Sequence, residues 1–408
     1  MERRTKGIVR VATGLIAVLA VQPVLGLRLP VLVIALIVIA GIAFRASRPT
    51  LNVPIDRWSI LFAGAPFLLM LVDIPRAPTW SEGWQTAERA SSLLVLPTVF
   101  LLLLPRFSQA QRRTWMDLFS ISGLLLIGFV CLTAFVRTGE AWDPSMPLSM
   151  RVRSHFAAST GIHAVYGSYY FLVAALFLLD GSGQEGARGR ARAIATIPLV
   201  LAAAVLASRM PLLAFLVSGG YLFLRTGLRK SRSRWWSFTT ILLLVLGAFV
   251  WVPTLRERGM DVLTNSGEGL GPGSVRHAVL HCGLEVLEEN WLFGVGLGRV
   301  QENMDVCYSQ FDIPALLDGH HGPHNQFLTW WIGLGAIGAL AFALLFLYPM
   351  QRSLALQDHI HYSFLLFILL CSLTEDLLSR QWGLVLFSTF HAIFQNTSSL
   401  VRGEGPKA

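Results

Sequence analysis

The chain has 408 residues, of which 54% are hydrophobic and only 14% are charged. Together with repeated apolar runs of about 15–25 residues, this composition is typical of a multi-span helical membrane protein and excludes an ordinary soluble enzyme. The formal charge of +9 does not by itself indicate nucleic-acid binding, because excess arginine in a membrane protein is usually an orientation signal.

Twelve apolar segments follow one another along the chain, and we predict that each is a membrane helix. They are residues 8–25, 28–44, 58–72, 91–105, 116–136, 162–180, 194–207, 210–224, 236–255, 324–348, 362–374 and 382–396. The first lacks the small-residue cleavage site of a signal peptide, so we expect it to be retained. The prediction is one all-α integral membrane domain over residues 1–408, with one long loop at residues 256–323.

The charges of the connecting segments predict how the helices are oriented. With a cytoplasmic N-terminus, the inner side holds 21 Lys and Arg against 7 acidic residues, whereas the outer side holds 12 Arg against 17 acidic residues. Lys and Arg are enriched in cytoplasmic loops. We therefore expect about twelve spans, with both termini in the cytoplasm.

Some segments are too short to cross a bilayer alone. Residues 194–207 and 210–224 are about 14–15 residues long, against roughly 20 for a full span, and they flank the tip ASRMP. We expect this hairpin to turn on the outer side, with Arg209 recessed below the surface; a single kinked helix is the alternative. Residues 362–396 repeat the pattern around TEDLLSRQ.

The predicted outer side collects the polar residues that could carry chemistry. In the long loop, SVRHAVLHCGLEVLEENWLF has the spacing of an amphipathic helix lying along the membrane surface. No predicted span has a charged residue near its middle, whereas ion-coupled transporters usually need such groups or helices broken at the midplane. The pattern favours chemistry at the outer surface over transport.

The cysteines fall into two groups. Cys131 and Cys371 lie within predicted spans, where we expect them to pack. Cys282 and Cys307 share the long outer loop and could form a disulfide in an oxidising compartment. Two free thiols fit the sequence equally well.

The long loop is also rich in histidine. A metal site could be built from its imidazoles and one thiol: His277, His281, Cys282, His320, His321 and His324. The chain has no HExxH, no paired CxxC and no carboxylate at a familiar metal spacing, so we predict no metal. The alternative is a set of interfacial polar residues without a chemical role.

His324 is the strongest catalytic candidate in this loop. Pro323 suits the first turn of a helix, which would place His324 and Asn325 at the outer N-terminus of the span at residues 324–348. The helix dipole there disfavours the imidazolium, leaving a neutral ring that can act as a general base.

Arg209 and Arg276 are the candidate anion-binding residues. A recessed arginine at the start of an apolar helix is costly without an anionic partner, and a helix N-terminus is itself an anion site. Guanidinium groups hold phosphate bidentately. For Arg209, an internal ion pair is the open alternative, with Glu88, Glu375 or Asp376.

The segment GVGLG contains Gly294, Gly296 and Gly298, a spacing that suggests a nucleotide-binding loop. It follows LEENWLF instead of a strand of a βαβ unit, and it is predicted to face outward, so we reject nucleotide binding. We expect the glycines to permit a tight turn or a close approach of two backbones.

Taken together, these segments resemble the O-antigen ligase and O-antigen polymerase superfamily. HNQFLTWWIGLGAIGAL is similar to its His-Asn-x-x-Leu signature, SRMPLLAFL to its Ser-Arg tip, and SVRHAVLHCGLEVLEENWLFGVGLG to its Arg-containing helix ending in GxGxG. IHAVYGSYY and TEDLLSRQWGLVLF resemble motifs of a ligase-like branch from Gram-negative bacteria. The resemblance covers about residues 160–396.

The resemblance implies a metal-independent glycosyltransferase with a GT-C-like fold and no cofactor, active at the periplasmic face of the bacterial inner membrane. Members move a glycan from undecaprenyl pyrophosphate to an acceptor hydroxyl, which the ligases find on the lipid A–core oligosaccharide. Carried over to this chain, Arg209 and Arg276 would bind the pyrophosphate and His324 would activate the acceptor. Attack opposite the leaving group implies inversion. The expected partners are this donor, a lipid or oligosaccharide acceptor and membrane lipid, with no nucleic acid.

Further outer-side residues are candidates for substrate contacts. They are Arg89, His163, Tyr166, Tyr169, Asn325, Glu375 and Gln381. An interfacial role is the alternative for the aromatic residues. At the level of function, a polymerase that joins lipid-linked repeat units would use much the same residues, and a polysaccharide or lipid transporter and a membrane scaffold are the alternatives from other classes.

Overall fold

The computed structural model describes residues 2–26, 28–48, 56–136, 148–182, 186–206, 209–226, 275–311 and 322–398, with single residues between 235 and 247. Over these ranges the regular elements are helical, and no strand occurs among them. The predicted all-α class is therefore confirmed for the described part of the chain. His320, His321 and the predicted span at residues 236–255 lie outside it, apart from those single residues.

The helices are numbered in chain order with gaps. The first group is α1 (Glu2–Ala20), α2 (Arg28–Ser47), α3 (Arg57–Asp73), α4 (Trp80–Ala90), α5 (Ser92–Thr98), α6 (Gln109–Val136), α7 (Leu148–Thr160) and α8 (Ala164–Gly181). The second is α9 (Ala187–Val205), α10 (Arg209–Thr226), α13 (Val275–Asn290), α14 (Val300–Tyr308), α16 (Gln326–Ala355), α17 (His359–Ser372) and α18 (Gln381–Ser398). Short helical turns include η2 (Ile74–Arg76), η3 (Val99–Leu103), η4 (Leu297–Arg299) and η5 (Leu377–Ser379).

Several helices are long and apolar enough to cross a membrane. In the described part of the chain there are six: Leu29–Ser47, Arg57–Arg76, Trp80–Leu103, Gln109–Val136, Ala164–Gly181 and Gln326–Ala355. A seventh apolar helix, His359–Ser372, is shorter. The chain is therefore a multi-pass membrane protein, while the count of twelve spans and the GT-C-like arrangement stay predictions.

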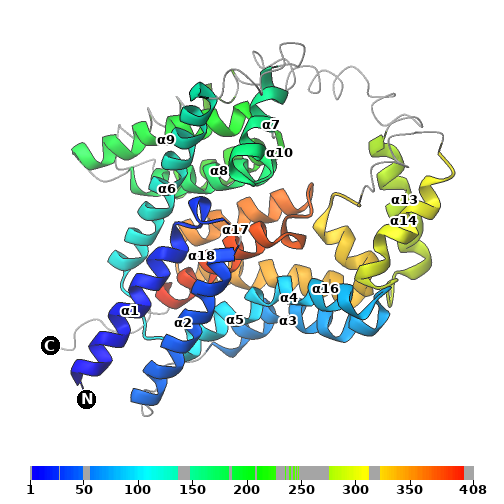
Figure 1. Ribbon diagram of the computed structural model, residues 1–408, viewed down its shortest axis with the longest axis horizontal. Helices are drawn as coiled ribbons and strands as arrows, with labels where there is room; N and C mark the ends of the chain where they lie inside the picture. The colour runs from blue at the N-terminus through cyan, green and yellow to red at the C-terminus, as the bar shows by residue number, and fades with distance from the viewer. Residues whose placement is uncertain are drawn as a thin grey trace.

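The centre of the molecule is built around α8, α17 and α18. Nearly every side chain of α8 is buried, which is typical of a helix that is apolar on all sides and enclosed by others. Figure 1 shows α17 and α18 between a group containing α6 to α10 and a group containing α2 to α5 and α16. Phe177 of α8 packs against Phe364 and Phe390 of these two helices, with ring centroids 6.2 and 4.7 Å away.

One end of the helix bundle carries a set of ion pairs between helix ends. They are Arg112–Asp358 at 2.7 Å, Arg113–Asp180 at 2.7 Å, Arg192–Asp117 at 2.5 Å, and Arg352–Asp56. Six of these residues belong to connections predicted to be cytoplasmic, and Asp117 and Asp180 lie at the predicted inner ends of the spans 116–136 and 162–180. The structure therefore gathers at one end the segments that the charge distribution assigned to one side.

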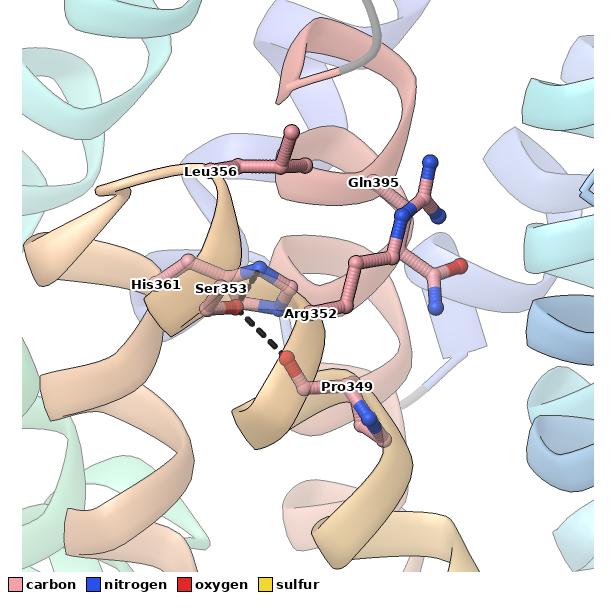
Figure 2. Close-up of a pocket in the computed structure, with 6 residues that line it drawn as sticks. All are labelled: Pro349, Arg352, Ser353, Leu356, His361 and Gln395. Atoms are coloured by element: carbon pink, nitrogen blue, oxygen red, sulfur yellow. Dashed lines mark hydrogen bonds between the residues drawn. The ribbon is translucent and has the colours of Figure 1, made fainter.

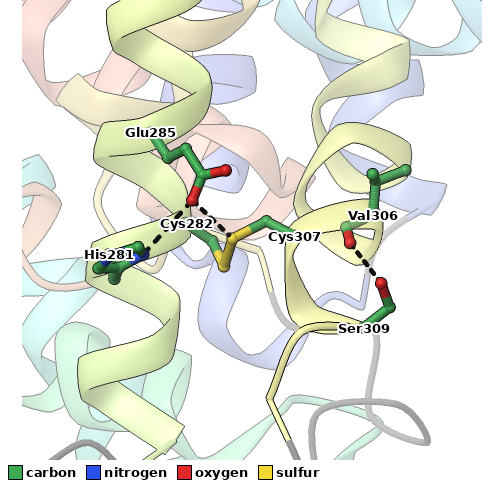
Figure 3. Close-up of a disulfide and its surroundings, with 6 residues drawn as sticks. All are labelled: His281, Cys282, Glu285, Val306, Cys307 and Ser309. Atoms are coloured by element: carbon green, nitrogen blue, oxygen red, sulfur yellow. Dashed lines mark hydrogen bonds and ion pairs between the residues drawn. A yellow bond between two sulfur atoms is a disulfide. The ribbon is translucent and has the colours of Figure 1, made fainter.

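At the other end, α13, α14 and the beginning of α16 pack around a hydrophobic cluster of their own (Figure 1). Leu328 and Ile332 of α16 pack there with Val279 and Val286 of α13. A disulfide joins Cys282 of α13 to Cys307 of α14, with the two Cα atoms 5.6 Å apart (Figure 3). We call α13, η4, α14 and residues 326–334 of α16 the outer unit.

The helix α16 is broken at Gly335, whose φ of 71° and ψ of −161° are not helical. Unbroken spans were expected for a protein that is not a transporter, and α16 does not meet that expectation. The gap is occupied by backbone of the GVGLG loop: Val295 and Gly296 donate hydrogen bonds to the carbonyls of Ile332 and Gly333. The expected close approach of two backbones at these glycines is confirmed.

Candidate active site

The outer ends of α8, α16 and α17 are tied together by the short segment that follows α17. Within it, Asp376 accepts hydrogen bonds from Thr329 of α16 at 2.6 Å and, at its backbone carbonyl, from Tyr166 of α8 at 3.4 Å. The neighbouring Glu375 lies beside His324. Residues separated by up to 210 positions thus meet at one place in the fold.

His324 lies just before α16, in the left-handed region of the backbone with φ of 48°. Asn325 is the N-cap, and its side-chain oxygen accepts a hydrogen bond from Leu328 N–H at 3.1 Å. The placement of Pro323 in the first helical turn is therefore wrong, because the helix begins at Gln326. Since the dipole acts mainly within the first turn, it acts less directly on His324 than the sequence suggested.

Glu375 is the acidic neighbour of His324. Its Oε2 lies 3.6 Å from His324 Nδ1, and the two side chains are 40% and 52% exposed. Both groups are thus open to solvent while remaining close enough for an ion pair. A carboxylate on the Nδ1 side leaves Nε2 of the ring directed elsewhere, as in the histidine–carboxylate pairs of hydrolases.

Gln326 was not identified from the sequence, although it holds this region together. Its fully buried side chain donates to Ser379 Oγ at 3.0 Å and accepts from Leu378 N–H at 2.7 Å. It therefore fixes η5 against the first turn of α16. The feature of the sequence that could have identified Gln326 is its place as a glutamine at the start of an otherwise apolar helix. Gln381, a predicted substrate contact, is the first residue of α18 immediately after this segment.

Burial changes the ionisation of two groups in this region. The largely buried position of Asp376 raises the pKa of its carboxyl, partly offset by the hydrogen bond from Thr329 and the charge of His324. Desolvation lowers the pKa of His163, and Arg153 lowers it further, while Glu375 acts in the opposite direction. The structure therefore brings His163 into the same electrostatic environment as Glu375.

The two tyrosines predicted with His163 occupy different positions. Tyr166 is half-buried and reaches Asp376, so it lies at the candidate site. Tyr169 is 1% exposed and packs its ring edge-on to Phe367, with centroids 6.4 Å apart. Its place in the core is that of a packing residue.

Arg209 is the first residue of α10 and is partly exposed. The helix α10 packs against α17. Near the far end of α10, Tyr221 Oη lies 3.2 Å from His359 Nδ1 at the start of α17, so the two helices run antiparallel. Arg209 therefore begins α10 at the end where α17 approaches Glu375.

The remaining candidates lie around this centre. Arg276 is the second residue of α13, but its side chain and that of His277 lie outside the described part of the structure. Arg89 is exposed on α4, a helix that contacts η5 and η4. The structure thus brings together His163, Tyr166, His324 and Glu375, and it places the helices of Arg89 and Arg276 against neighbouring elements.

A possible metal-ligand group was found at the disulfide. The ligand atoms of His281, Cys282 and Cys307 lie within 4.8 Å of one another, and Glu285 Oε2 is 3.5 Å from His281 Nδ1 (Figure 3). Because the two sulfurs are bonded to each other, neither is a thiolate ligand in this state. Of the two alternatives that the sequence left open for Cys282 and Cys307, the structure has the disulfide.

A small pocket lies at the opposite end of α16 from His324. It is lined by Pro349, Arg352, Ser353, Leu356, His361 and Gln395 (Figure 2). Ser353 Oγ lies 2.8 Å from His361 Nδ1 and donates to the Pro349 carbonyl. The piece of α16 that follows the break at Gly335 alone rises roughly 25 Å to Arg352, and the pocket lies beside the Arg352–Asp56 ion pair, at the end of the bundle away from His324.

Comparison with protein families gives one match. The family model described as O-Antigen ligase matches residues 194–343, which run from α9 into α16 and include Arg209, Arg276 and His324. A search of curated proteins found no match.

Proposed function

Residues 194–343 place this chain in the O-antigen ligase superfamily, and from this premise we propose that it transfers a glycan from undecaprenyl pyrophosphate to an acceptor hydroxyl. The reaction takes place at the periplasmic face of the bacterial inner membrane. The family supports a ligase- or polymerase-type membrane glycosyltransferase. The lipid donor, the acceptor and the mechanism are our proposals.

The observation that carries the proposal is the His324–Glu375 pair. Glu375 Oε2 lies 3.6 Å from Nδ1 of a half-exposed imidazole at the opening of α16. In the proposed reaction, Nε2 of His324 takes the proton of the acceptor hydroxyl, and Glu375 stabilises the imidazolium that forms. Catalytic hydrogen bonds are often long without substrate, so this spacing suits a pair that tightens on binding.

The bond changes in this mechanism balance without a metal or cofactor. The acceptor oxygen attacks the anomeric carbon, the carbon–oxygen bond to the pyrophosphate breaks, and its electron pair leaves with undecaprenyl pyrophosphate. Arg209 and Arg276 stabilise the charge that develops on this leaving group. The proton held by His324 then passes to solvent. Attack from the face opposite the pyrophosphate inverts the anomeric centre.

The test is transfer by the purified chain. The protein is incubated with an undecaprenyl-pyrophosphate glycan and candidate acceptors, and the product and its anomer are identified by mass spectrometry and NMR. We expect transfer with wild type and with His281→Ala, an exposed histidine in the same loop, but not with His324→Ala. Unchanged transfer by His324→Ala would refute the mechanism. A lack of turnover by wild type with every acceptor would favour the transporter alternative.

Removing Arg209 tests the anion-binding role. We expect Arg209→Ala to fold and to lose transfer by roughly 10²–10³-fold, the usual effect of deleting a group that stabilises developing charge. Arg188→Ala, at an exposed position on α9, is the matched control and should transfer normally. Normal glycan attachment by Arg209→Ala, measured on the same donor, would remove the pyrophosphate role.

Ligase and polymerase activities are separated in cells. Deleting a ligase leaves the full-length glycan on its lipid carrier, whereas deleting a polymerase leaves single repeat units on the acceptor. We propose the ligase outcome on the basis of the family match. In either case we expect chelators to have little effect on transfer, and inhibition reversed by zinc would instead require a metal.

A further inference from the structure

The break in α16 is closed by the GVGLG loop and the turn just before it, through three backbone hydrogen bonds. Val295 N–H donates to the Ile332 carbonyl at 2.8 Å, and Gly296 N–H donates to Gly333 at 2.8 Å. In the opposite direction, Ala336 N–H donates to the Leu292 carbonyl at 3.1 Å. Because buried backbone groups must be paired, the loop and the broken helix complete each other.

The glycines at this junction leave no space for side chains. A Cβ on Gly294 would lie 2.5 Å from the Gly333 carbonyl oxygen, and one on Gly335 would overlap the Leu292 carbonyl. Gly294, Gly296 and Gly335 also have φ between 66° and 94°. The junction therefore exists in a single close-fitting arrangement.

Two charged residues hold the loop in place: Asp73, the last residue of α3, and Arg76, in η2 directly after it. Arg76 donates through Nη1 to the Phe293 carbonyl at 3.0 Å and through Nη2 to the Gly294 carbonyl. Asp73 Oδ2 accepts a hydrogen bond from Leu297 N–H at 2.7 Å, and its Oδ1 lies 3.3 Å from Arg76 Nη1. We call Asp73 and Arg76 the clamp.

The clamped loop connects the two helices of the outer unit that lead to candidate residues, α13 and the first part of α16. It directly follows α13, whose first turn contains Arg276, and it is bonded to the part of α16 that begins beside His324. The disulfide and the second hydrophobic cluster make these pieces one packed body. The clamp fastens this outer unit to the outer end of α3, a helix that also packs against α16.

We propose that Asp73 and Arg76 are positioning residues for glycan transfer. They fix where the outer unit sits and so set the first turn of α13 and His324 against Arg209 and Glu375, which belong to α10 and to the segment after α17. This role rests on the proposed function. A displacement of about 1 Å at a reacting centre can cost as much as 100-fold in rate, so small movements of the outer unit matter.

The test combines kinetics with hydrogen exchange in the full chain. Arg76→Gln and Asp73→Ala are compared with Arg57→Gln, an exposed arginine at the other end of α3. We expect roughly 10- to 100-fold lower kcat with a smaller change in donor KM, and faster amide exchange at Val295, Gly296 and Ala336. Asp73→Asn keeps an acceptor for Leu297 and should recover much of the kcat lost in Asp73→Ala.

The double variant and the exchange data decide whether the clamp positions the site. Because both residues hold one loop, Arg76→Gln/Asp73→Ala should lose little more kcat than the worse single variant. Faster exchange with unchanged kcat would overturn the positioning role, as would lower kcat with unchanged exchange. If wild type transfers no glycan, the proposed function fails, and unchanged exchange in the clamp variants would then refute the clamp separately.

Discussion

Glu375 lies beside His324, whereas its sequence position suggested a partner for Arg209 or a substrate contact. The pairing arises because Gln326 and Thr329 of α16 bind the segment that contains Glu375. His324 is thus oriented by residues from a loop fifty positions away. At this scale, the function of each side chain depends on the neighbour that the fold supplies.

Replacing Glu375 tests whether the carboxylate assists the imidazole. We expect Glu375→Gln to lower kcat by roughly 10- to 100-fold with little change in donor KM, because the imidazolium loses its stabilising charge while the anion site is untouched. Steady-state transfer kinetics measure both constants. Glu302→Gln, an exposed glutamate on α14, is the control. An increase in KM alone would instead indicate a role in binding.

Asp376 should make the protein's stability depend on pH. Burial raises the pKa of this carboxyl above 3.8, so its contribution to folding is present below that value and is lost as the pH rises through the raised pKa. We expect Asp376→Asn, which keeps an acceptor for Thr329, to raise Tm at neutral pH. The gain should shrink as the pH approaches 4. A lower Tm for the variant at neutral pH would contradict this account.

Among the elements, the outer unit differs most from the sequence prediction. The helix expected in SVRHAVLHCGLEVLEENWLF is present as α13, and its exposed Leu280 and Leu284 are four residues apart, on one face of the helix. The predicted continuous span at residues 324–348 is instead two helical pieces joined at Gly335. Its outer piece packs with α13 and α14, because Leu328 and Ile332 face their apolar cluster.

Adding a single methyl group at Gly335 should disrupt the close contact between the broken helix α16 and the loop that fills its break. In Gly335→Ala the new Cβ would overlap the Leu292 carbonyl and force a residue with a side chain to φ near 71°. We expect a lower Tm and severe loss of transfer. Gly128→Ala, where a Cβ would meet nothing within 4 Å, should leave both unchanged. Thermal unfolding and transfer assays of the two variants give the comparison, and equal behaviour would argue against the close-fitting junction.

At the scale of the whole molecule, the ion pairs between helix ends and the candidate site lie at opposite ends of the described structure. The ion pairs that include Arg112–Asp358 and Arg113–Asp180 lie at the end that holds the predicted inner loops. His324, Glu375 and the disulfide lie at the other end. This separation fits an outer surface where lipid-linked substrate is handled and an inner surface that fixes orientation.

Thiol labelling tests this orientation in cells. In a Cys131→Ala background, a membrane-impermeant maleimide should label Glu302→Cys on α14 in cells whose outer membrane is permeable. It should label Arg188→Cys on α9 only after the inner membrane is opened. Both positions are exposed, so accessibility across the membrane decides the result. The reverse pattern would place the candidate site in the cytoplasm.

The apolar runs and the bias of Lys and Arg determined the helical membrane class and the grouping of loops, because burial in lipid and charge placement act on local sequence. The HNQF and GVGLG segments likewise indicated a site and a close backbone approach. The tertiary structure alone decided that Glu375 meets His324, that α16 breaks at Gly335, and that Asp73 and Arg76 hold the loop. The contacts behind these features join residues from 37 to 224 positions apart, and the sequence has no local signal of such pairing.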